Sequence, residues 1–295
     1  MPMKIIENPV ARRGAAQRYF NTVENYFQKH GFEIDHQLTD YAGHAEKIAH
    51  QAVQQGFDTI VSVGGDGTLN EIVNGIIKAD GDPLLGIIPV GTCNDFIKSV
   101  NIPHDIHAAC HIVASGYSRR VDVASAGHRY FINAIGIGFD VKIVEDLSIY
   151  SVVPGKIGYL STALKHIFSY KAMPLDLLNG HHDFTSKAIM LTVANGQYYG
   201  GTFHIAPQAD PTDGLLDVIL IEDVPTLRRL SMVPRVIAGT HLTAPNVKHI
   251  LASELKITAS SALTTQIEGE LVNWTTNEIN LSVLHNRLKI ASLKN

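Results

Sequence analysis

The amino-acid sequence predicts an α/β domain with a parallel sheet, followed by a second, mainly antiparallel β domain. Apolar strand patterns alternate with helical patterns before Asp122, and strand patterns dominate after it. Strands separated by helices form βαβ units, whereas strands separated by turn signals form antiparallel sheets. A length of 295 residues is sufficient for two such domains.

The elements before Asp122 follow one another in βαβ order. Two helical patterns end at glycines, Gly31 and Gly56, which are typical helix stops. The run TIVSV at residues 59–63 is apolar and β-branched, as a parallel strand covered on both faces requires. We expect strands at residues 4–7, 34–38, 59–63 and 85–89, and helices at residues 15–30, 43–55 and 70–78.

The elements after Asp122 are mostly strands divided by turn signals, namely Asn179-Gly180, Asn195-Gly196 and Asp213-Gly214. We expect strands at residues 130–134, 188–194, 216–221, 254–259 and 279–283, and helices at residues 157–169 and 227–238. The predicted domains are residues 1–122 and 123–283, with the tail from about 284 to 295 free to pack back on the first domain.

Composition excludes several classes of protein. A net charge of -4 provides no global basic field for nucleic acid. Two cysteines cannot form a disulfide framework. The apolar runs are much shorter than the ~20 residues that span a bilayer, and the N-terminal residues lack a signal-peptide pattern. We therefore expect a cytoplasmic protein, although a charged fraction of 18% and a mean hydropathy of +0.07 make it slightly apolar.

The most informative stretch is Ile60–Glu71, IVSVGGDGTLNE, in which an apolar strand runs through glycines into a helix. Glycines at such a turn let backbone N–H groups approach a phosphate, and the helix N-terminus favours negative charge. Asp66 adds negative charge at the same place, which is compatible with phosphate only if Mg²⁺ intervenes. A lone glycine-rich turn that merely packs is an equally good interpretation.

A second strand-to-helix turn, PVGTCNDF at residues 89–96, repeats this combination of glycine, hydroxyl and aspartate. Two such turns in one βαβ domain favour a nucleotide-phosphate site. Neither the GxxxxGK[ST] loop nor a complete GxGxxG fingerprint occurs in the sequence.

Several collinear motifs resemble the diacylglycerol kinase catalytic superfamily, in particular its soluble bacterial lipid kinases and sphingosine-kinase relatives. The motifs are GGDGTLNEIVNG (64–75), PVGTCNDF (89–96), NGQYYGG (195–201), AP (206–207), DGLLDV (213–218) and EGE (268–270). The resemblance implies an N-terminal nucleotide-binding α/β domain, a C-terminal β-sandwich for the lipid substrate, and an active site in the cleft between the domains.

The resemblance also implies roles for individual residues. The ATP-binding positions are Asn8, Pro9 and the loop up to Gly14, Thr39, Gly65, Asp66, Gly67, Thr68, Leu69, Asn70, Glu71 and Thr92. Asp66, Asp95 and Asp122 match aspartates that support the catalytic Mg²⁺, and Glu270 matches the general base. A structural Mg²⁺ or Ca²⁺ in some members corresponds to Asp213 with the carbonyls of Asp210 and Leu215. Glu268 departs from the family's aspartate.

The resemblance implies an ATP- and Mg²⁺-dependent kinase of a membrane lipid, with diacylglycerol as the leading acceptor. The alternatives are a sphingoid base, phosphatidylglycerol or NAD as acceptor, and a non-catalytic lipid- or nucleotide-binding regulator. The expected partners are the lipid and, transiently, the inner face of the membrane; a homodimer is left open.

Two segments have two interpretations each. The helical stretch Thr226–Ala238 carries Arg228, Arg229 and Arg235 among apolar residues. It is either a face that draws the protein to anionic lipid or an ordinary helix packed on the β domain. The apolar segment 150–170 either lines or covers a lipid pocket or belongs to the core.

Overall fold

The computed structural model describes residues 2–11, 16–150, 155–180 and 183–294. The chain divides into two compact units: unit 1 is Met1–Val123 with His285–Asn295, and unit 2 is Ala124–Leu284. The strands β5 (Ser118–Ala126) and β15 (Glu278–Ala291) each contain residues of both units. The chain therefore leaves unit 1 through β5 and returns to it through β15.

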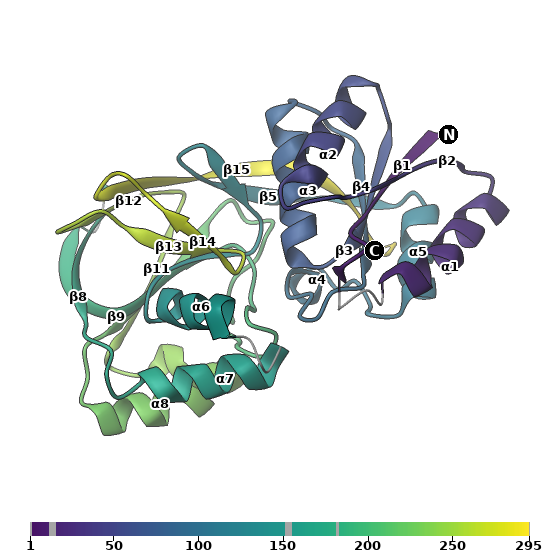
Figure 1. The fold of residues 1–295 in the computed structure, drawn as a ribbon. Coiled ribbons are helices and arrows are strands. Elements are labelled where there is room, and N and C mark those ends of the chain that lie inside the picture. Colours follow the sequence, from purple (N-terminus) through teal and green to yellow (C-terminus); the bar gives the residue numbers. More distant parts are fainter. Residues whose placement is uncertain (1, 12–15, 151–154, 181–182, 295) are drawn as a thin grey trace. The chain divides into compact units, whose positions relative to one another are not determined.

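Unit 1 is a parallel sheet with helices on both faces. Besides β5 and β15, its elements are β1 (Pro2–Glu7), α1 (Ala16–Lys29), β2 (Glu33–Leu38), α2 (His44–Gln54), β3 (Thr59–Gly64), α3 (Asp66–Lys78), β4 (Leu84–Pro89), α4 (Phe96–Ser99) and α5 (Ile106–Ala114). The strand order is β2-β1-β3-β4-β15, and every pair is parallel. Figure 1 shows α2 and α3 together on one side of the sheet and α1 and α5 on the other. The predicted α/β class is confirmed.

The helix after β3 begins earlier than the sequence pattern indicated. We expected it at residue 70, but α3 begins at Asp66, directly after Gly65. Gly65 has an extended backbone (φ -104°, ψ -171°), so a single residue separates strand from helix. The motif therefore supplies the first turn of the helix itself.

Unit 2 is an antiparallel β structure that also contains α-helices among its described residues. Its elements are β6 (Arg129–Phe131), β7 (Ala134–Gly138), α6 (Phe139–Tyr150), α7 (Gly155–His166), β8 (Met173–Leu178), β9 (Phe184–Ala194), β10 (Leu216–Glu222), α8 (Thr226–Ala238), a 3-10 turn (His241–Thr243), β11 (Val247–Ala252), β12 (Glu254–Ala259), β13 (Thr264–Ile267) and β14 (Glu270–Asn273). The strands follow the order β14-β13-β7-β9-β8-β12-β15, and β10 pairs with β9 and β11. The antiparallel class predicted after Asp122 is confirmed.

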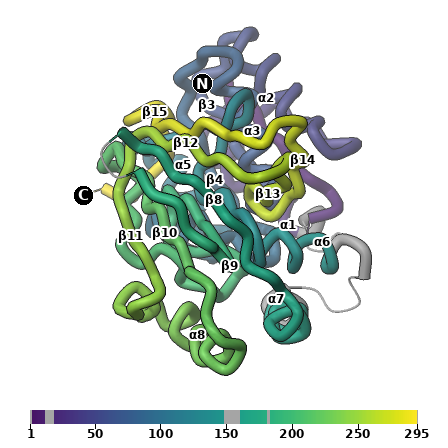
Figure 2. Tube along the Cα trace, turned by 90° about the vertical axis from the view of Figure 1, so that its left-hand side faces the viewer, coloured from purple at the N-terminus to yellow at the C-terminus, as the bar shows by residue number. Residues whose placement is uncertain are grey.

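The strands β9 and β10 are buried on both faces. Leu191 and Val193 of β9 and Val218 of β10 belong to one hydrophobic core, which is formed by residues of the unit 2 strands. Ile189 of β9 and Ile219 of β10 belong to a second core against the helices. Burial on both faces explains the continuous apolar run at residues 188–194. Figure 2 shows the helices α6, α7 and α8 gathered along one margin of unit 2.

The segment expected as one strand at residues 130–134 is two strands. β6 ends at Phe131 and β7 begins at Ala134. The N–H groups of Ile132 and Asn133, between the strands, donate to a side chain instead of a neighbouring strand. Within the described ranges, no helix has the length and apolar character needed to cross a bilayer.

Candidate active site

The strands β3 and β4 end side by side, and a glycine-containing turn follows each. Gly64 pairs with Pro89 in the parallel register, and the Gly64 carbonyl accepts the N–H group of Gly91 at 3.1 Å. A Cβ atom on Gly91 would lie 2.4 Å from Cα of Gly65. The two turns therefore pack backbone against backbone, and no side chain fits between them.

Asp66 links the two turns. Its Oδ1 atom accepts the N–H groups of Asp95 at 2.7 Å and Phe96 at 3.3 Å. Burial, and then the nearby Asp95 carboxylate, raise the pKa of Asp66 to about 6, against the opposing effect of these N–H groups and Lys98. Lys98 Nζ lies 2.5 Å from Asp95 Oδ1. Two crowded carboxylates are hard oxygen donors, so this pair fits a divalent cation such as Mg²⁺.

The loop after β1 is bonded to the first turn. Asn8 Nδ2 donates to Thr68 Oγ1 at 2.9 Å, and Asn8 Oδ1 accepts the N–H group of Val10 at 3.1 Å. Thr39 N–H donates to the Glu7 carbonyl at 2.8 Å, which ties the loop after β2 to the loop after β1. The structure thus brings Asn8, Thr39 and Thr68 to one edge of the sheet, where the carboxyl ends of parallel strands bind ligands.

The other residues expected at this edge differ in how far their side chains are exposed and in what those side chains contact. The carboxylate of Glu71 accepts the N–H group of Gly43 at 2.8 Å and so holds the start of α2. Leu69 is only 3% exposed, within the core of unit 1, whereas Thr92 is exposed on the second turn. Residues 12–14 of the expected loop lie outside the described residues.

Glu7, at the end of β1, was not singled out in the sequence. Its side chain is buried, burial raises its pKa, and its Oε2 atom lies 3.0 Å from His36 Nε2. Glu7 Oε1 and Asn70 Oδ1 are buried without a hydrogen-bond partner among the described residues, so both can accept a bond from a bound group. One sequence feature could have identified Glu7: it is an acidic residue that ends an apolar strand and directly precedes Asn8-Pro9.

Asp122 lies on β5 and is fully buried. Its Oδ1 atom accepts the N–H group of Asn286 at 2.7 Å and lies 2.9 Å from His285 Nδ1. Both partners come from β15, so Asp122 holds the returning strand within unit 1.

In unit 2, Glu270 follows a two-residue hairpin turn between β13 and β14. Glu268 and Gly269, the turn residues, have φ angles of +53° and +83°, and Ile267 pairs with Glu270 across the turn. Positive φ at both turn positions is typical of the type I′ hairpin, in which Asp-Gly is common and Glu is unusual. Glu270 is exposed at the first position of β14.

A buried polar chain supports this hairpin. Gln266 Oε1 accepts the Gly269 N–H group at 2.8 Å, and Gln266 Nε2 donates to Asp140 Oδ2 at 3.3 Å. Burial raises the pKa of Asp140 to about 7, against the hydrogen bonds from Gln266 and the Val141 N–H group. Gln266 and Asp140 were not predicted as site residues, because nothing in their spacing indicates that they meet.

Glu268 stands where the sequence resemblance implies an aspartate, and its longer side chain has a structural role. Its Oε1 atom accepts the N–H groups of Ile132 at 3.0 Å and Asn133 at 2.7 Å. These are the N–H groups left between β6 and β7, so Glu268 fixes that turn to the hairpin that precedes Glu270.

The loop expected to hold a structural metal is closed by its own hydrogen bonds. Asp210 Oδ1 accepts the hydroxyl of Thr212 at 2.7 Å, and Asp213 Oδ1 accepts the N–H group of Leu215 at 2.9 Å. Among the described residues, no group of three or more His, Cys, Asp or Glu side chains is suited to a metal ion. A cation here would depend on backbone carbonyls together with Asp213.

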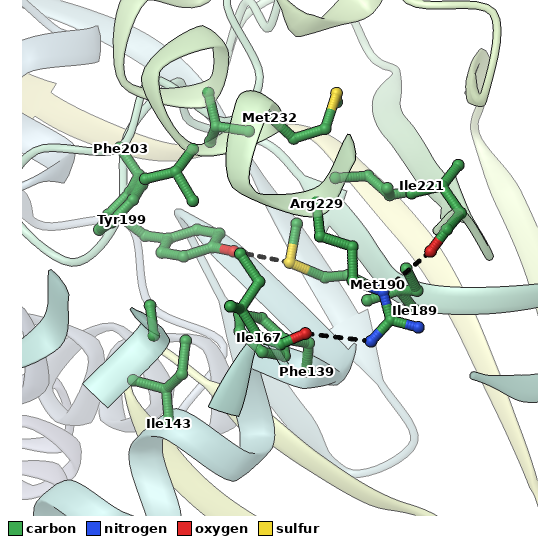
Figure 3. Close-up of a pocket in the computed structure, with 14 residues that line it drawn as sticks. Phe139, Ile143, Ile167, Ile189, Met190, Tyr199, Phe203, Ile221, Arg229 and Met232 are labelled. Carbon is green, nitrogen blue, oxygen red and sulfur yellow. Dashed lines mark hydrogen bonds between the residues drawn. The ribbon is translucent and has the colours of Figure 1, made fainter. Parts of the chain in front are cut away.

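Unit 2 also contains an apolar cavity of about 80 Å³ between α6, α7, α8 and the strands β9 and β10 (Figure 3). Its walls include Phe139, Met190 and Phe203, and Tyr199 Oη donates to Met190 Sδ at 3.4 Å. Arg229 is the charged residue at the wall, and its Nη1 atom donates to the Ile167 carbonyl at 3.2 Å. Of the expected apolar segment 150–170, Ala163 and Ile167 line this cavity, whereas residues 151–154 lie outside the described part of the chain.

Comparisons with known families match nearly the whole chain. Residues 2–126 match the family described as "Diacylglycerol kinase catalytic domain". Residues 133–291 match the "YegS C-terminal NAD kinase beta sandwich-like domain".

Curated relatives and solved structures are similar to the chain over most of their length. A diacylglycerol kinase of Bacillus subtilis (strain 168) is 28% identical over 90% of this chain and 89% of its own. A diacylglycerol kinase of Staphylococcus saprophyticus is 28% identical over 90% and 88%. A crystal structure of a diacylglycerol kinase from Bacillus anthracis str. Sterne covers 99% of this chain and 96% of its own with a TM-score of 0.77 at 20% identity. A second structure from that organism has a TM-score of 0.81 at 23% identity. These structures support the fold.

Proposed function

Because the chain belongs to the diacylglycerol kinase catalytic superfamily, a family of lipid kinases, we propose that it transfers the terminal phosphate of Mg-ATP to the free hydroxyl of diacylglycerol. The observation that carries this proposal is the junction of the two glycine turns at Asp66. It combines backbone N–H groups at a helix start with two carboxylates, which suits a nucleotide phosphate and its cation.

The loops at the carboxyl edge of the unit 1 sheet would bind the nucleotide. Asn8, Pro9, Thr39, Thr92 and the turn from Gly65 to Glu71 are the proposed contacts. Backbone N–H groups at the start of α3 would donate to phosphate oxygens. Leu69 contributes only its backbone because its side chain is in the core, and Glu71 acts by fixing the start of α2.

Asp66, Asp95 and Asp122 would hold Mg²⁺, partly through water. When bound, Mg²⁺ neutralises the charge that develops on the transferred phosphate. The raised pKa of Asp66 reflects repulsion between carboxylates as well as burial. A cation relieves that repulsion, so cation and nucleotide binding should strengthen one another.

Glu270 would act as the general base. An alcohol is a weak nucleophile, and a carboxylate within hydrogen-bond reach accepts its proton as the new P–O bond forms. The type I′ turn, held by Glu268 and Gln266, fixes the backbone from which Glu270 projects.

The apolar cavity in unit 2 favours a lipid acceptor over NAD. Its lining is almost entirely hydrocarbon, which matches an acyl chain and offers little to the polar groups of a dinucleotide. A sphingoid base or phosphatidylglycerol remains an alternative acceptor. The same proposal includes transient contact of the protein with the membrane. It also includes a homodimer and a structural Mg²⁺ or Ca²⁺ held at Asp213.

A lipid panel tests the proposal. Purified protein with radiolabelled ATP and Mg²⁺ is incubated with mixed micelles of diacylglycerol, sphingosine or phosphatidylglycerol, and separately with NAD. We expect phosphatidic acid as the dominant product. A dominant product from another acceptor would reassign the substrate, and phosphate transfer to none of them would favour the non-catalytic regulator.

A further inference from the structure

We infer that unit 2 carries a docking surface for an anionic bilayer, formed by the end of α7, the segment directly after it and the outer face of α8. This inference rests on the proposed function, because a diacylglycerol acceptor resides in a membrane. The α7–α8 surface consists of Leu164, Phe168, Lys171, Leu227, Arg228 and Arg235, all of which are exposed.

The helix α8 has two faces of different character. Met232 and Val236, four residues apart, are buried and line the apolar cavity. Arg228 and Arg235, two turns apart, share the exposed side with Leu227, which is 79% exposed. The helix thus faces a hydrocarbon-lined cavity on one side and solvent on the other.

The end of α7 and the residues directly after it repeat this division. Ala163 and Ile167 line the cavity, whereas the residue after each of them, Leu164 and Phe168, is exposed. Phe168 is 61% exposed, which is unusual for a large aromatic side chain without a partner surface.

Arg229 joins the end of α7 to the start of α8. Its guanidinium group donates to the carbonyls of Tyr170 at 2.6 Å, Ile167 at 3.2 Å and Val224 at 3.0 Å. Phe168 lies between two of these acceptors in sequence, and Arg228 precedes the donor. These contacts, and the cavity that Ile167 and Met232 line together, place the two stretches beside one another in unit 2.

The charges on this surface favour an anionic partner. The acidic residues beside it are paired: Asp223 with Arg229 at 3.0 Å, and Asp146 with Lys165 at 2.8 Å. Lys171, Arg228 and Arg235 form no ion pair with any residue that the structure describes. The whole chain has a net charge of -4, so this basic, apolar surface contrasts with the rest of the protein. Exposed apolar side chains among basic residues are typical of helices that rest on anionic headgroups.

Vesicle sedimentation tests the inference. Full-length protein is mixed with vesicles of phosphatidylcholine alone or of equimolar phosphatidylcholine and phosphatidylglycerol. We expect binding to the anionic vesicles only, weakened by salt. The pair Arg228→Gln with Arg235→Gln should bind about 25-fold more weakly, about fivefold per charge. The pair Phe168→Ser with Leu227→Ser should bind about tenfold more weakly. The charge-matched control, Lys29→Gln with Arg129→Gln, removes exposed basic residues elsewhere and should bind like the wild type.

Activity separates this inference from the proposed function. Both surface variants should phosphorylate diacylglycerol in detergent micelles at the wild-type rate and lose activity on anionic vesicles. Wild-type binding by the surface variants, or equal binding to neutral vesicles, would overturn the docking surface even if kinase activity is present. A change in oligomeric state of the surface variants without vesicles would instead assign this face to a second copy of the chain. If the wild type phosphorylates no lipid, the proposed function is refuted, whereas vesicle sedimentation needs no activity and still tests the docking surface.

Discussion

Gln266 Oε1 accepts the N–H group of Gly269 at 2.8 Å, one residue before the exposed carboxylate of Glu270. The same amide donates to the buried Asp140. A side chain that is buried and bonded at both ends cannot rotate freely, so Gln266 limits where the hairpin can place Glu270.

We predict that Gln266→Leu lowers kcat about tenfold and leaves the KM for ATP unchanged, because the hairpin loses its buried acceptor while unit 1 is untouched. Steady-state kinetics on diacylglycerol micelles measures both constants. Gln28→Leu on α1 is the matched control. An unchanged kcat with lowered thermal stability would limit Gln266 to a purely structural role.

We predict that Glu270→Gln lowers kcat by about 10²–10⁴-fold, because the amide cannot accept the proton of the acceptor hydroxyl. Nucleotide affinity, measured by calorimetry, should stay within about twofold, since Glu270 lies in unit 2. A full-rate variant would refute its assignment as the base.

We predict that Asp66→Asn stabilises the protein at neutral pH by about 3 kcal/mol when divalent cations are removed. The pKa of Asp66 is raised from 3.8 to about 6, so the folded state binds its proton more tightly than the unfolded state does. For this group, stability is greatest below about pH 4 and falls as pH rises through about 6. The amide removes that penalty and keeps an oxygen for the Asp95 N–H group.

Thermal unfolding with EDTA or excess Mg²⁺ measures this prediction. Mg²⁺ should raise the Tm of the wild type and leave that of Asp66→Asn nearly unchanged, because binding to the native state stabilises it. The control Asp58→Asn should behave like the wild type. A lower stability of Asp66→Asn in EDTA at neutral pH would contradict the assigned electrostatic cost.

We predict that Glu268→Ala lowers the free energy of unfolding by about 1–3 kcal/mol, because the N–H groups of Ile132 and Asn133 lose their acceptor in a buried place. Urea denaturation measures the change. Glu254→Ala, at an exposed position of β12, should change stability by less than about 0.5 kcal/mol. Equal losses in both variants would show that the acceptor contributes nothing specific.

We predict that Gly91→Ala abolishes nucleotide binding while unit 2 stays folded. Its Cβ atom would lie 2.4 Å from Gly65 Cα and 2.6 Å from Asn94 Oδ1, so the two turns must separate. Calorimetry with Mg-ATP measures binding, and limited proteolysis reports on unit 2. Gly116→Ala is the control: its Cβ meets no atom within 4 Å, and its φ of +72° strains the backbone away from the two turns, so it should lose some stability and still bind Mg-ATP. Wild-type affinity in Gly91→Ala would show that the contact between the turns is dispensable.

Local sequence patterns were sufficient to predict the fold class and the strand-to-helix turn at Asp66. The run into Gly64 and Gly65 marks the end of a buried strand, and a parallel sheet brings the ends of neighbouring strands together. The meeting of Asp66 with the N–H group of Asp95 follows from this topology. The start of α3 was placed too late because Gly65 was assigned to a longer turn.

Long-range pairings could not be predicted. Nothing in the spacing of Asp140 and Gln266 indicates that they bond, and the carboxylate of Glu268 reaches N–H groups far away in the sequence. The residues 188–194 show no alternation because both faces of β9 are buried, so the second core and its cavity were invisible in the pattern. Such features depend on which strands pair, which a single sequence does not encode locally.

The return of β15 to unit 1 has a consequence for biosynthesis. Unit 2 is one continuous segment, whereas unit 1 needs Ile290 beside Leu85 and Asn286 beside Asp122. A ribosome therefore exposes all of unit 2 before unit 1 can close its sheet, and β4 has an open edge until then. The emerging chain cannot assemble the complete Asp122 environment, so the nucleotide unit matures last although most of it is made first.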